Sequence, residues 1–431
     1  MTHIRIPYHT SALEADLPTA WRATALTPPC HAAADVRPPS IDEQRRCVER
    51  ALDRPIGSPP LETLAAGKAT ATVITSDHTR PVPSRITLPL LLDRLRRGNP
   101  AINIRILVAT GCHRATTPGE LREKFGEEVV RRETFLIHDC TDTASLRQLA
   151  RLPSGGELWL NRAALDTDLL VAEGFIEPHF FAGFSGGRKS VLPGIAGRTT
   201  VLANHCAAFI ADPHARAGSL AGNPIHRDML FAAQQAHLAF ILNVTINTDK
   251  SIRAAFAGHP EEAHATGCRH LAEEVTIPRM PGDIVITGNG GYPLDQNIYQ
   301  AVKGMTAAEA CCNPGGTVIM VAGCCDGAGG ENFYQALSEM KNPRELLDAI
   351  GRVPQDKTAP DQWEVQILAR ILAKHRVILV SDVCDATVIR SMGMEAATSL
   401  PEAIDIAGRT APQDARVTVI PDGVSVIVEN T

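Results

Sequence analysis

The sequence predicts two α/β domains with largely parallel sheets and an active-site cleft between them. Its 431 residues are too many for one ordinary hydrophobic core. Beyond about residue 60, short apolar runs alternate with amphipathic stretches, which is the pattern of βα units. The stretch Glu273–Gly282 is typical of a linker and puts the boundary near Val275. We therefore expect an N-terminal domain over residues 1–275 and a C-terminal domain over residues 276–431, with the cleft between them as the site.

In the N-terminal domain, three predicted buried strands each lead into a polar cluster. They are expected at Ala69–Thr75, Ile102–Thr110 and Leu169–Glu173. A helix is expected at Ile41–Leu52, and another begins with Thr117 as N-cap and Glu120 closing a capping box. In open α/β sheets, ligands bind beyond the carboxyl ends of the strands, so these clusters mark a candidate site.

A second series of strands and helices follows the linker. Strands are expected at Asp283–Thr287, Gly315–Ala322 and Val377–Ser381, and helices at Asn297–Cys312 and Trp363–His375. This alternation predicts that the C-terminal domain is also of the α/β class.

Composition excludes several classes of protein. The 42 basic and 48 acidic residues give a net charge of −6, so the chain lacks the basic surface that binds nucleic acid or an anionic membrane. It has no apolar run of membrane-spanning length and no secretory leader, and we expect a cytoplasmic protein. The 11 cysteines include no C-x-x-C pair, which favours reduced thiols over disulfides or a zinc knuckle.

The glycine-rich stretch Gly174–Gly197 is the most informative part of the chain. It contains His179 and Lys189, and this mixture is typical of a loop that grips a ligand, although a tight loop with a solvated lysine is the alternative. Ser185 also stands in a G-x-S-x-G pattern, the nucleophile elbow of hydrolases. That elbow needs a strand directly before the serine, and the preceding residues are too few for one. A serine hydrolase using Ser185 nevertheless stays open.

Other candidate residues give weaker signals. His113, His179 and His205 lie on three separate segments without the i, i+4 spacing of a helical zinc pair. Asp77 and Arg80 follow a predicted strand and could hold a ribose hydroxyl and an anion, or form a salt bridge.

Gln300 and Lys303 are three residues apart and share one face of a predicted helix. Their amide and ammonium donors suit a carboxylate, and a polar face in solvent is the alternative.

Taken together, these motifs resemble the nickel-dependent lactate racemase family. Their order and spacing agree over residues 77–303, with a looser match at Trp363. The matching stretches are Asp77–Pro81, Gly111–Arg114 with Thr117 and Glu120, Pro178–Lys189, Asn204-His205, Gly290–Pro293 and Tyr299–Lys303. Cys112 departs from the pattern, since many relatives carry a hydroxyl residue there.

The resemblance implies a nickel-pincer nucleotide, a pyridinium mononucleotide whose two sulfur arms flank a nickel–carbon bond. It implies that Lys189 is joined to this cofactor through a thioamide and that His205 is the protein ligand of nickel. Paired acid/base roles are implied for His113 and His179. The cofactor would be lined by Asp77, His78, Thr79 and Arg80, and the substrate carboxylate would be held by Arg80, Gln300 and Lys303.

The implied reaction is racemisation or epimerisation of a 2-hydroxy acid, lactate or a relative, by proton-coupled hydride transfer. Removing the α-hydrogen as a proton is hard beside a carboxylate, whereas removing it as hydride needs an electrophile that side chains do not supply. One base for each enantiomer explains two histidines. Proteins that make the cofactor are the expected partners. A non-catalytic carrier of nickel or of its nucleotide is a further alternative.

Overall fold

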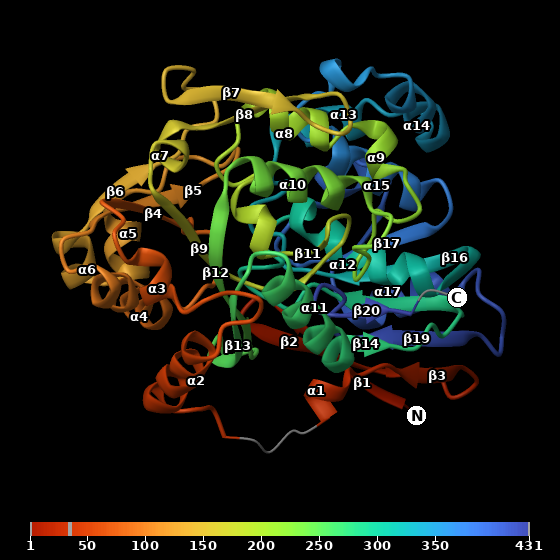
Figure 1. Ribbon diagram of the computed structural model, residues 1–431. Helices are drawn as coiled ribbons and strands as arrows, with labels where there is room; N and C mark the ends of the chain where they lie inside the picture. Colours follow the sequence, from red (N-terminus) through yellow and green to blue (C-terminus); the bar gives the residue numbers. More distant parts are fainter. Residues whose placement is uncertain (1, 33–36, 430–431) are drawn as a thin grey trace.

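The computed structural model describes residues 2–32 and 37–429, in which two six-stranded sheets form the framework. The strand order is β13-β12-β9-β4-β5-β6 in one sheet and β18-β17-β16-β15-β19-β3 in the other. Figure 1 shows the two sheets in opposite halves of the molecule, with both chain ends on the side of the second sheet. The predicted α/β class with largely parallel sheets is confirmed.

The first sheet is parallel except for its edge strand β13, which runs antiparallel to β12. Its strands are β4 (Thr70–Ser76), β5 (Asn103–Ala109), β6 (Thr134–Ile137), β9 (Leu169–Phe175), β12 (Leu238–Ile246) and β13 (Ile252–Gly258). The central strands are continuous apolar runs because both faces are covered, one of them by α2 (Ile41–Asp53), α3 (Leu61–Ala65) and α4 (Ser84–Gly98).

All strands of the second sheet are parallel. They are β3 (Arg22–Ala25), β15 (Gly282–Gly288), β16 (Cys312–Val321), β17 (Arg376–Val380), β18 (Glu395–Ala397) and β19 (Arg416–Ile420). Three helices that follow them are α12 (Ile298–Cys311), α15 (Gln362–Leu372) and α17 (Leu400–Gly408). The hairpin of β1 (Thr2–Tyr8) and β2 (Ser11–Leu17) packs with α17 over one face, where Ile4 and Ile6 join the core of this sheet.

Two details correct the predicted domain division. Residues 1–275 were expected in the N-terminal domain, but β3 pairs with β19 and the hairpin covers the second sheet, so the first strands belong with the C-terminal half. The expected linker Glu273–Gly282 is also more regular than an extended link. Helix α11 (Glu262–Val275) ends within it, and β14 (Thr276–Ile277) pairs with β20 (Ile427–Val428).

The predicted helix starts are confirmed by their caps. Ser40 forms a capping box with Glu43 at the start of α2, and Thr117 forms one with Glu120 at the start of α5 (Pro118–Phe125).

The remaining elements connect or cover the sheets. They are α1 (Pro29–Ala32), α6 (Glu127–Arg132), β7 (Leu146–Arg151), β8 (Glu157–Asn161), α7 (Arg162–Leu165), β10 (Pro178–His179), β11 (Gly183–Phe184), α8 (Arg198–Asn204), α9 (Ala207–Ile210), α10 (Pro224–Gln235), α13 (Glu331–Ser338), α14 (Pro343–Gly351) and α16 (Ala386–Ser391), with 3₁₀ turns at Gly187–Ser190 and Gln355–Lys357. No helix in the described ranges is long and apolar enough to cross a membrane.

Candidate active site

Two adjoining cavities lie between the carboxyl ends of β4, β5 and β9 and the helices α12 and α15. The inner cavity has a volume of about 500 Å³ and the outer cavity about 1160 Å³. All ten residues predicted for the site line one or both of them. The two cavities share Arg80, His113, His179, Lys189, Gln300 and Lys303, the inner one adds Asp77 and His205, and the outer one adds His78 and Thr79. The strand order β5-β4-β9 explains this meeting, because neighbouring parallel strands end at the same edge.

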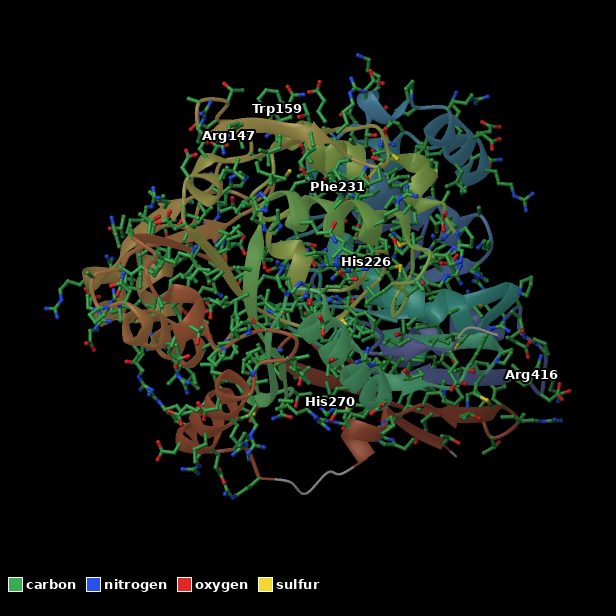
Figure 2. All side chains as sticks on the ribbon, in the orientation of Figure 1. Arg147, Trp159, His226, Phe231, His270 and Arg416 are labelled. Carbon is green, nitrogen blue, oxygen red and sulfur yellow. The ribbon has the colours of Figure 1, made fainter. Side chains whose placement is uncertain are left out.

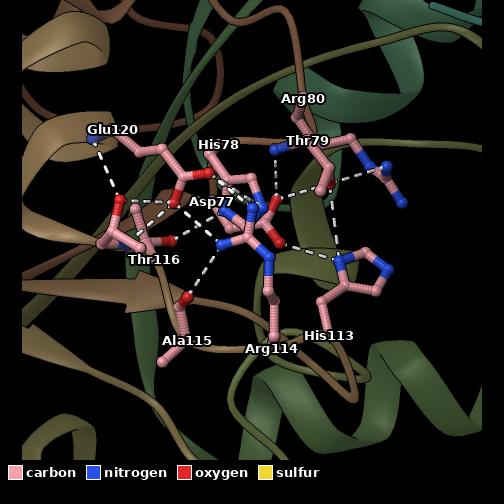
Figure 3. Close-up of polar contacts among 10 residues, drawn as sticks. Asp77, His78, Thr79, Arg80, His113, Arg114, Ala115, Thr116 and Glu120 are labelled. Atoms are coloured by element: carbon pink, nitrogen blue, oxygen red, sulfur yellow. Dashed lines mark hydrogen bonds and ion pairs between the residues drawn. The ribbon is translucent and has the colours of Figure 1, made fainter.

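Asp77 orients His113 at the mouth of this site. Its side chain is 1% exposed, and its Oδ1 accepts hydrogen bonds from the Thr79 amide (3.1 Å) and hydroxyl (2.7 Å). Its Oδ2 lies 2.7 Å from Nδ1 of His113 (Figure 3). Burial alone would raise the pKa of Asp77, but His113, Thr79 and Arg80 outweigh it and bring that pKa to about 2. An ionised carboxylate only accepts, so the proton of neutral His113 sits on Nδ1 and its Nε2 is unprotonated.

His78 lies on the other side of the same loop. Its Nδ1 is 3.1 Å from the Thr116 hydroxyl, and its Nε2 is 3.7 Å from Glu120, which also pairs with Arg114 (Figure 3). Burial lowers the pKa of His78 despite the charges of Asp77 and Glu120. The structure therefore holds His78 against the start of α5, whereas Arg80 reaches both cavities.

A buried arginine supports the glycine-rich loop. The guanidinium of Arg188, 2% exposed, donates to the carbonyl oxygens of Ala182 (2.7 Å) and Phe184 (2.8 Å). Its Nε lies 3.0 Å from Nδ1 of His226, which Figure 2 places near the middle of the molecule. Burial lowers the pKa of Arg188 to about 10. This residue was not singled out from the sequence, yet it ties together the loop that carries the next residue, Lys189.

The same loop requires glycine where it passes β9. Gly186 has a φ of +76°, and a Cβ there would lie 2.8 Å from both the Asn243 side-chain oxygen and the Phe175 carbonyl oxygen. The backbone can turn toward Lys189 only without a side chain at this position.

Lys189 and His179 form a buried pair of neutral bases. The Nζ of Lys189 lies 3.1 Å from Nε2 of His179, and Nδ1 of His179 accepts a hydrogen bond from the Ala182 amide (3.2 Å). Because Nδ1 is an acceptor, the ring proton is on Nε2 and points at the lysine nitrogen, which must then offer a lone pair. Burial, followed by the surrounding cations, lowers the pKa of both groups well below their ordinary values, which agrees with this assignment.

The hydroxyl group of Ser185 forms hydrogen bonds with the backbone, one as donor and one as acceptor. It donates to the carbonyl oxygen of Phe175 (2.9 Å) and accepts from the amide of Glu177 (2.9 Å). The nearby His264 faces the carbonyl oxygen of Ser185 at 2.8 Å instead of its hydroxyl. This geometry gives no support to Ser185 as a nucleophile.

His205 presents a single unprotonated nitrogen to the inner cavity. Its Nδ1 lies 2.9 Å from the Val201 carbonyl oxygen, so Nδ1 carries the proton and Nε2 has a free lone pair. The ring packs between Phe181 (5.1 Å between centroids) and Trp363 (5.0 Å). Burial lowers the pKa of His205 to about 3, which keeps the imidazole neutral. Within the described ranges, no three His, Cys, Asp or Glu side chains are grouped so as to hold a metal ion.

Helix α12 brings the carboxylate-binding candidates to the opposite wall. The Nζ of Lys303 donates to Oε1 of Gln300 at 2.5 Å and lies 5.9 Å from the ring centroid of Phe180. Burial and the positive charge of Arg80 lower the pKa of Lys303, while Glu364 and Glu177 act in the opposite direction. Neither glutamate was picked out from the sequence.

Cys112, the residue that departs from the family pattern, faces another cysteine. A hydrogen bond to Cys140, together with burial, raises the pKa of Cys112, whereas the same bond and Arg198 lower that of Cys140 to about 6. The thiol of Cys112 is therefore directed at Cys140.

The chain matches known proteins over nearly its whole length. The lactate racemase N-terminal domain model matches residues 8–218, and the lactate racemase C-terminal domain model matches residues 277–428. The chain is 53% identical over 428 residues to the lactate racemase of Thermoanaerobacterium thermosaccharolyticum, covering 99% of each chain. It is 55% identical over 386 residues to that of Lactiplantibacillus plantarum, covering 90% of this chain and 91% of the relative.

Solved structures give the same result. The lactate racemase apoprotein of T. thermosaccharolyticum superposes with a TM-score of 0.95 at 52% identity, with both chains fully covered. A Thermotoga maritima protein that is 17% identical shares the fold, with a TM-score of 0.65 over 91% of this chain and 99% of that one. From the two domain models and relatives more than half identical over nearly its whole length, the chain belongs to the lactate racemase family.

Proposed function

We propose that this protein interconverts the enantiomers, or the epimers, of a 2-hydroxy acid, with lactate or a related 2-hydroxycarboxylate as substrate. The observation that carries the proposal is that two imidazoles from separate segments line one cavity, His113 paired with Asp77 and His179 with Lys189. The hydrogen bond to Asp77 leaves Nε2 of His113 as a proton acceptor, and His179 is a second acid/base group in the same cavity. On the opposite wall, the side chains of Gln300 and Lys303 would bind the substrate carboxylate.

The residues around Lys189 and His205 fit the nickel-pincer nucleotide that the family resemblance implies. Joining Lys189 to the cofactor through a thioamide requires an amine with a lone pair, and the contact with His179 supplies that form. A late transition metal held by sulfur arms accepts an imidazole nitrogen, and His205 Nε2 is free, with its ring oriented by the Val201 carbonyl. Asp77, His78, Thr79 and Arg80 would line the nucleotide.

The roles of the protein groups follow from these positions. A nickel-pincer nucleotide held by Lys189 and His205 would supply a hydride acceptor for the α-hydrogen of the substrate, which no side chain provides. His113 takes the hydroxyl proton at Nε2, and the Asp77 carboxylate stabilises the imidazolium that forms. When the opposite enantiomer is made, His179 first takes up a second proton from solvent and then returns it to the same oxygen as an imidazolium, while His113 releases its extra proton to solvent. The reverse reaction exchanges these roles. Arg80, Gln300 and Lys303 hold the carboxylate so that only the α-carbon changes configuration.

The test begins with the whole chain produced together with the cofactor-making proteins, its expected partners. We expect about one nickel per chain, a mass increment on the peptide that contains Lys189, and conversion of L-lactate to D-lactate without added NAD. Lys189→Ala should lose the increment. A holoprotein inactive on a broad panel of 2-hydroxy acids would contradict the proposal, as would wild-type turnover in both His113→Ala and His179→Ala.

The same variants separate the alternatives. A non-catalytic carrier of nickel or of its nucleotide would use Lys189 and His205 but gain nothing from the two opposed imidazoles. A serine hydrolase would need Ser185 as its nucleophile, so full activity of Ser185→Ala would exclude the hydrolase hypothesis. We also propose a cytoplasmic location, since the eleven cysteines are all free thiols.

A further inference from the structure

Glu364 is a buried carboxyl group in the wall of the inner cavity that the mechanism above does not use. Its side chain is 0% exposed, and neither of its oxygens has a hydrogen-bond partner among the described residues. A carboxyl group in such a place is costly unless it is protonated or faces a cation. The cation that acts on it is Lys303 of α12, the helix against which α15 packs.

The groups that act on Glu364 come from α12 and from the turn before α15. Lys303 of α12 favours the ionised form, whereas burial and the negative charge of Asp361 oppose it. Together these effects raise the pKa of Glu364 to about 8. Tyr299, also on α12, is affected by the same charge, since burial and Glu364 raise the pKa of its hydroxyl.

Lys303 has only part of its hydrogen-bonding capacity in use. One of its three N–H groups donates to Oε1 of Gln300, which leaves two for a ligand. In the free protein the negative charge that acts most strongly on the ammonium group of Lys303 is that of Glu364, a carboxylate like that of the proposed substrate. At buried positions the repulsion between two carboxylates is weakly screened, so a ligand carboxylate bound to Lys303 favours the protonated form of Glu364.

We infer that Glu364 is a positioning residue that acts through Lys303: where it is ionised in the free protein it balances the charge of the ammonium across the inner cavity, and it takes up a proton when a substrate carboxylate binds. The inference rests on the proposed function for the role of Lys303. The proton comes from solvent and adds to one carboxylate oxygen of Glu364, while Lys303 keeps all three of its own. The cavity thus gains the substrate's negative charge without gaining net charge.

This exchange makes binding depend on pH in a defined direction. Because the complex holds one more proton than the separate partners, affinity for the carboxylate falls as pH rises through about 8, by up to about tenfold per pH unit. In Glu364→Gln the amide takes up no proton, and this component of the pH dependence disappears.

The experiment is infrared difference spectroscopy of the full chain, with and without ligand, at pH 8. The ligands are DL-lactate and propionate, the latter a carboxylate without the 2-hydroxyl group. We expect binding of either ligand to produce the carbonyl band of a protonated carboxylic acid. Labelling with ¹³C-glutamate should shift the band, which assigns it to glutamate even if Glu364→Gln fails to fold. Glu364→Gln should abolish the band, and Asp361→Asn, which removes a neighbouring cavity carboxyl, should keep it.

The outcomes separate the inference from the proposed function. Ligand binding without the band, or a band that survives in Glu364→Gln, overturns the inference even if lactate is racemised. A band with propionate in a protein that racemises nothing supports the inference and counts against the function. Failure of propionate and lactate to bind removes the carboxylate site at Lys303 and the inference with it.

Discussion

Replacing Asp77 by Asn should impair catalysis without disturbing the fold. The amide can keep its oxygen toward Thr79, but it then turns an NH₂ group toward Nδ1 of His113, where a carboxylate oxygen lies 2.7 Å away in the wild type. Nδ1 must accept from the amide, so the ring proton moves to Nε2 and the proton acceptor of the site is lost. A hydrogen bond to a charged group contributes about 1.5–3 kcal/mol. At about 1.4 kcal/mol per factor of ten, we expect kcat to fall about 10- to 150-fold.

The chain contains a matched control for this variant. Asp139 follows β6 as Asp77 follows β4, and it accepts from the amide (2.8 Å) and hydroxyl (2.6 Å) of Thr141 in the same kind of turn. Its neighbour His138 directs its ring nitrogens to Ala196 and Asn161 instead. Asp139→Asn therefore removes a carboxylate from the same kind of turn, at an exposed position with no histidine to orient.

The assay is racemisation of lactate by holoprotein at pH 7, together with ¹⁵N NMR of the histidines in the full chain. In Asp77→Asn the shifts of His113 should change from the Nδ1–H to the Nε2–H tautomer, and in Asp139→Asn they should not. The reasoning fails if both variants keep kcat within about twofold of the wild type, a difference of only about 0.4 kcal/mol in the barrier. It also fails if the tautomer of His113 is unchanged in Asp77→Asn.

Three further predictions concern the surroundings of the bases. Arg188→Met should lower the free energy of unfolding by about 2 kcal/mol or more, because two backbone carbonyl groups lose their buried donor, and urea denaturation measures this loss. Phe181→Leu removes edge contacts with the imidazoles of His179 and His205, each worth about 0.5–1.5 kcal/mol, and should reduce both stability and racemisation. The control is Phe135→Leu, which loses one ring contact outside the cavity lining and should reduce stability alone. The pKa of His205 is lowered from 6.5 to about 3, so below pH 6.5 the unfolded chain binds a proton that the folded chain does not. Stability should therefore fall by about 2 kcal/mol from this group between pH 6.5 and 5, and His205→Asn should show a correspondingly smaller fall in urea titrations.

Much of the fold was predictable because its strands are mostly buried. The runs that became β4, β5 and β9 are mostly apolar and mostly buried, and the loops after their carboxyl ends carry Asp77, His113 and His179. What periodicity could not give is the pairing of distant segments. Strand β3 is only four residues long and mostly exposed, so nothing in its local pattern indicates that it completes the sheet of the other half.

In the candidate site, too, local pattern was predictable and long-range contact was not. Residues within short sequence motifs were identified, whereas residues whose role depends only on tertiary contacts were missed. Arg188 stands beside Lys189 in the sequence, but its partners lie up to 76 residues away. Glu364 offered one usable signal, since it is an acidic residue in the apolar helix Gln362–Leu372, where an unpaired charge is unfavourable. Such a residue marks a site only when the structure shows which cation faces it.

The charges of the cavity also explain why neutral bases and a carboxylate grip occur together. The pKa of His179 is lowered first by burial and then by the surrounding positive charges, so the imidazole of the free protein keeps its one ring proton and takes up no second proton at neutral pH. If a carboxylate binds to Lys303 and Arg80 as proposed, it neutralises part of that positive field, and the pKa of His179 should rise toward the range in which an imidazole both takes and gives protons. In the proposed mechanism, the cations that attract an anionic substrate therefore also keep His179 neutral until the substrate binds. The acid/base function of His179 would in this way be coupled to occupancy of the cavity by a carboxylate.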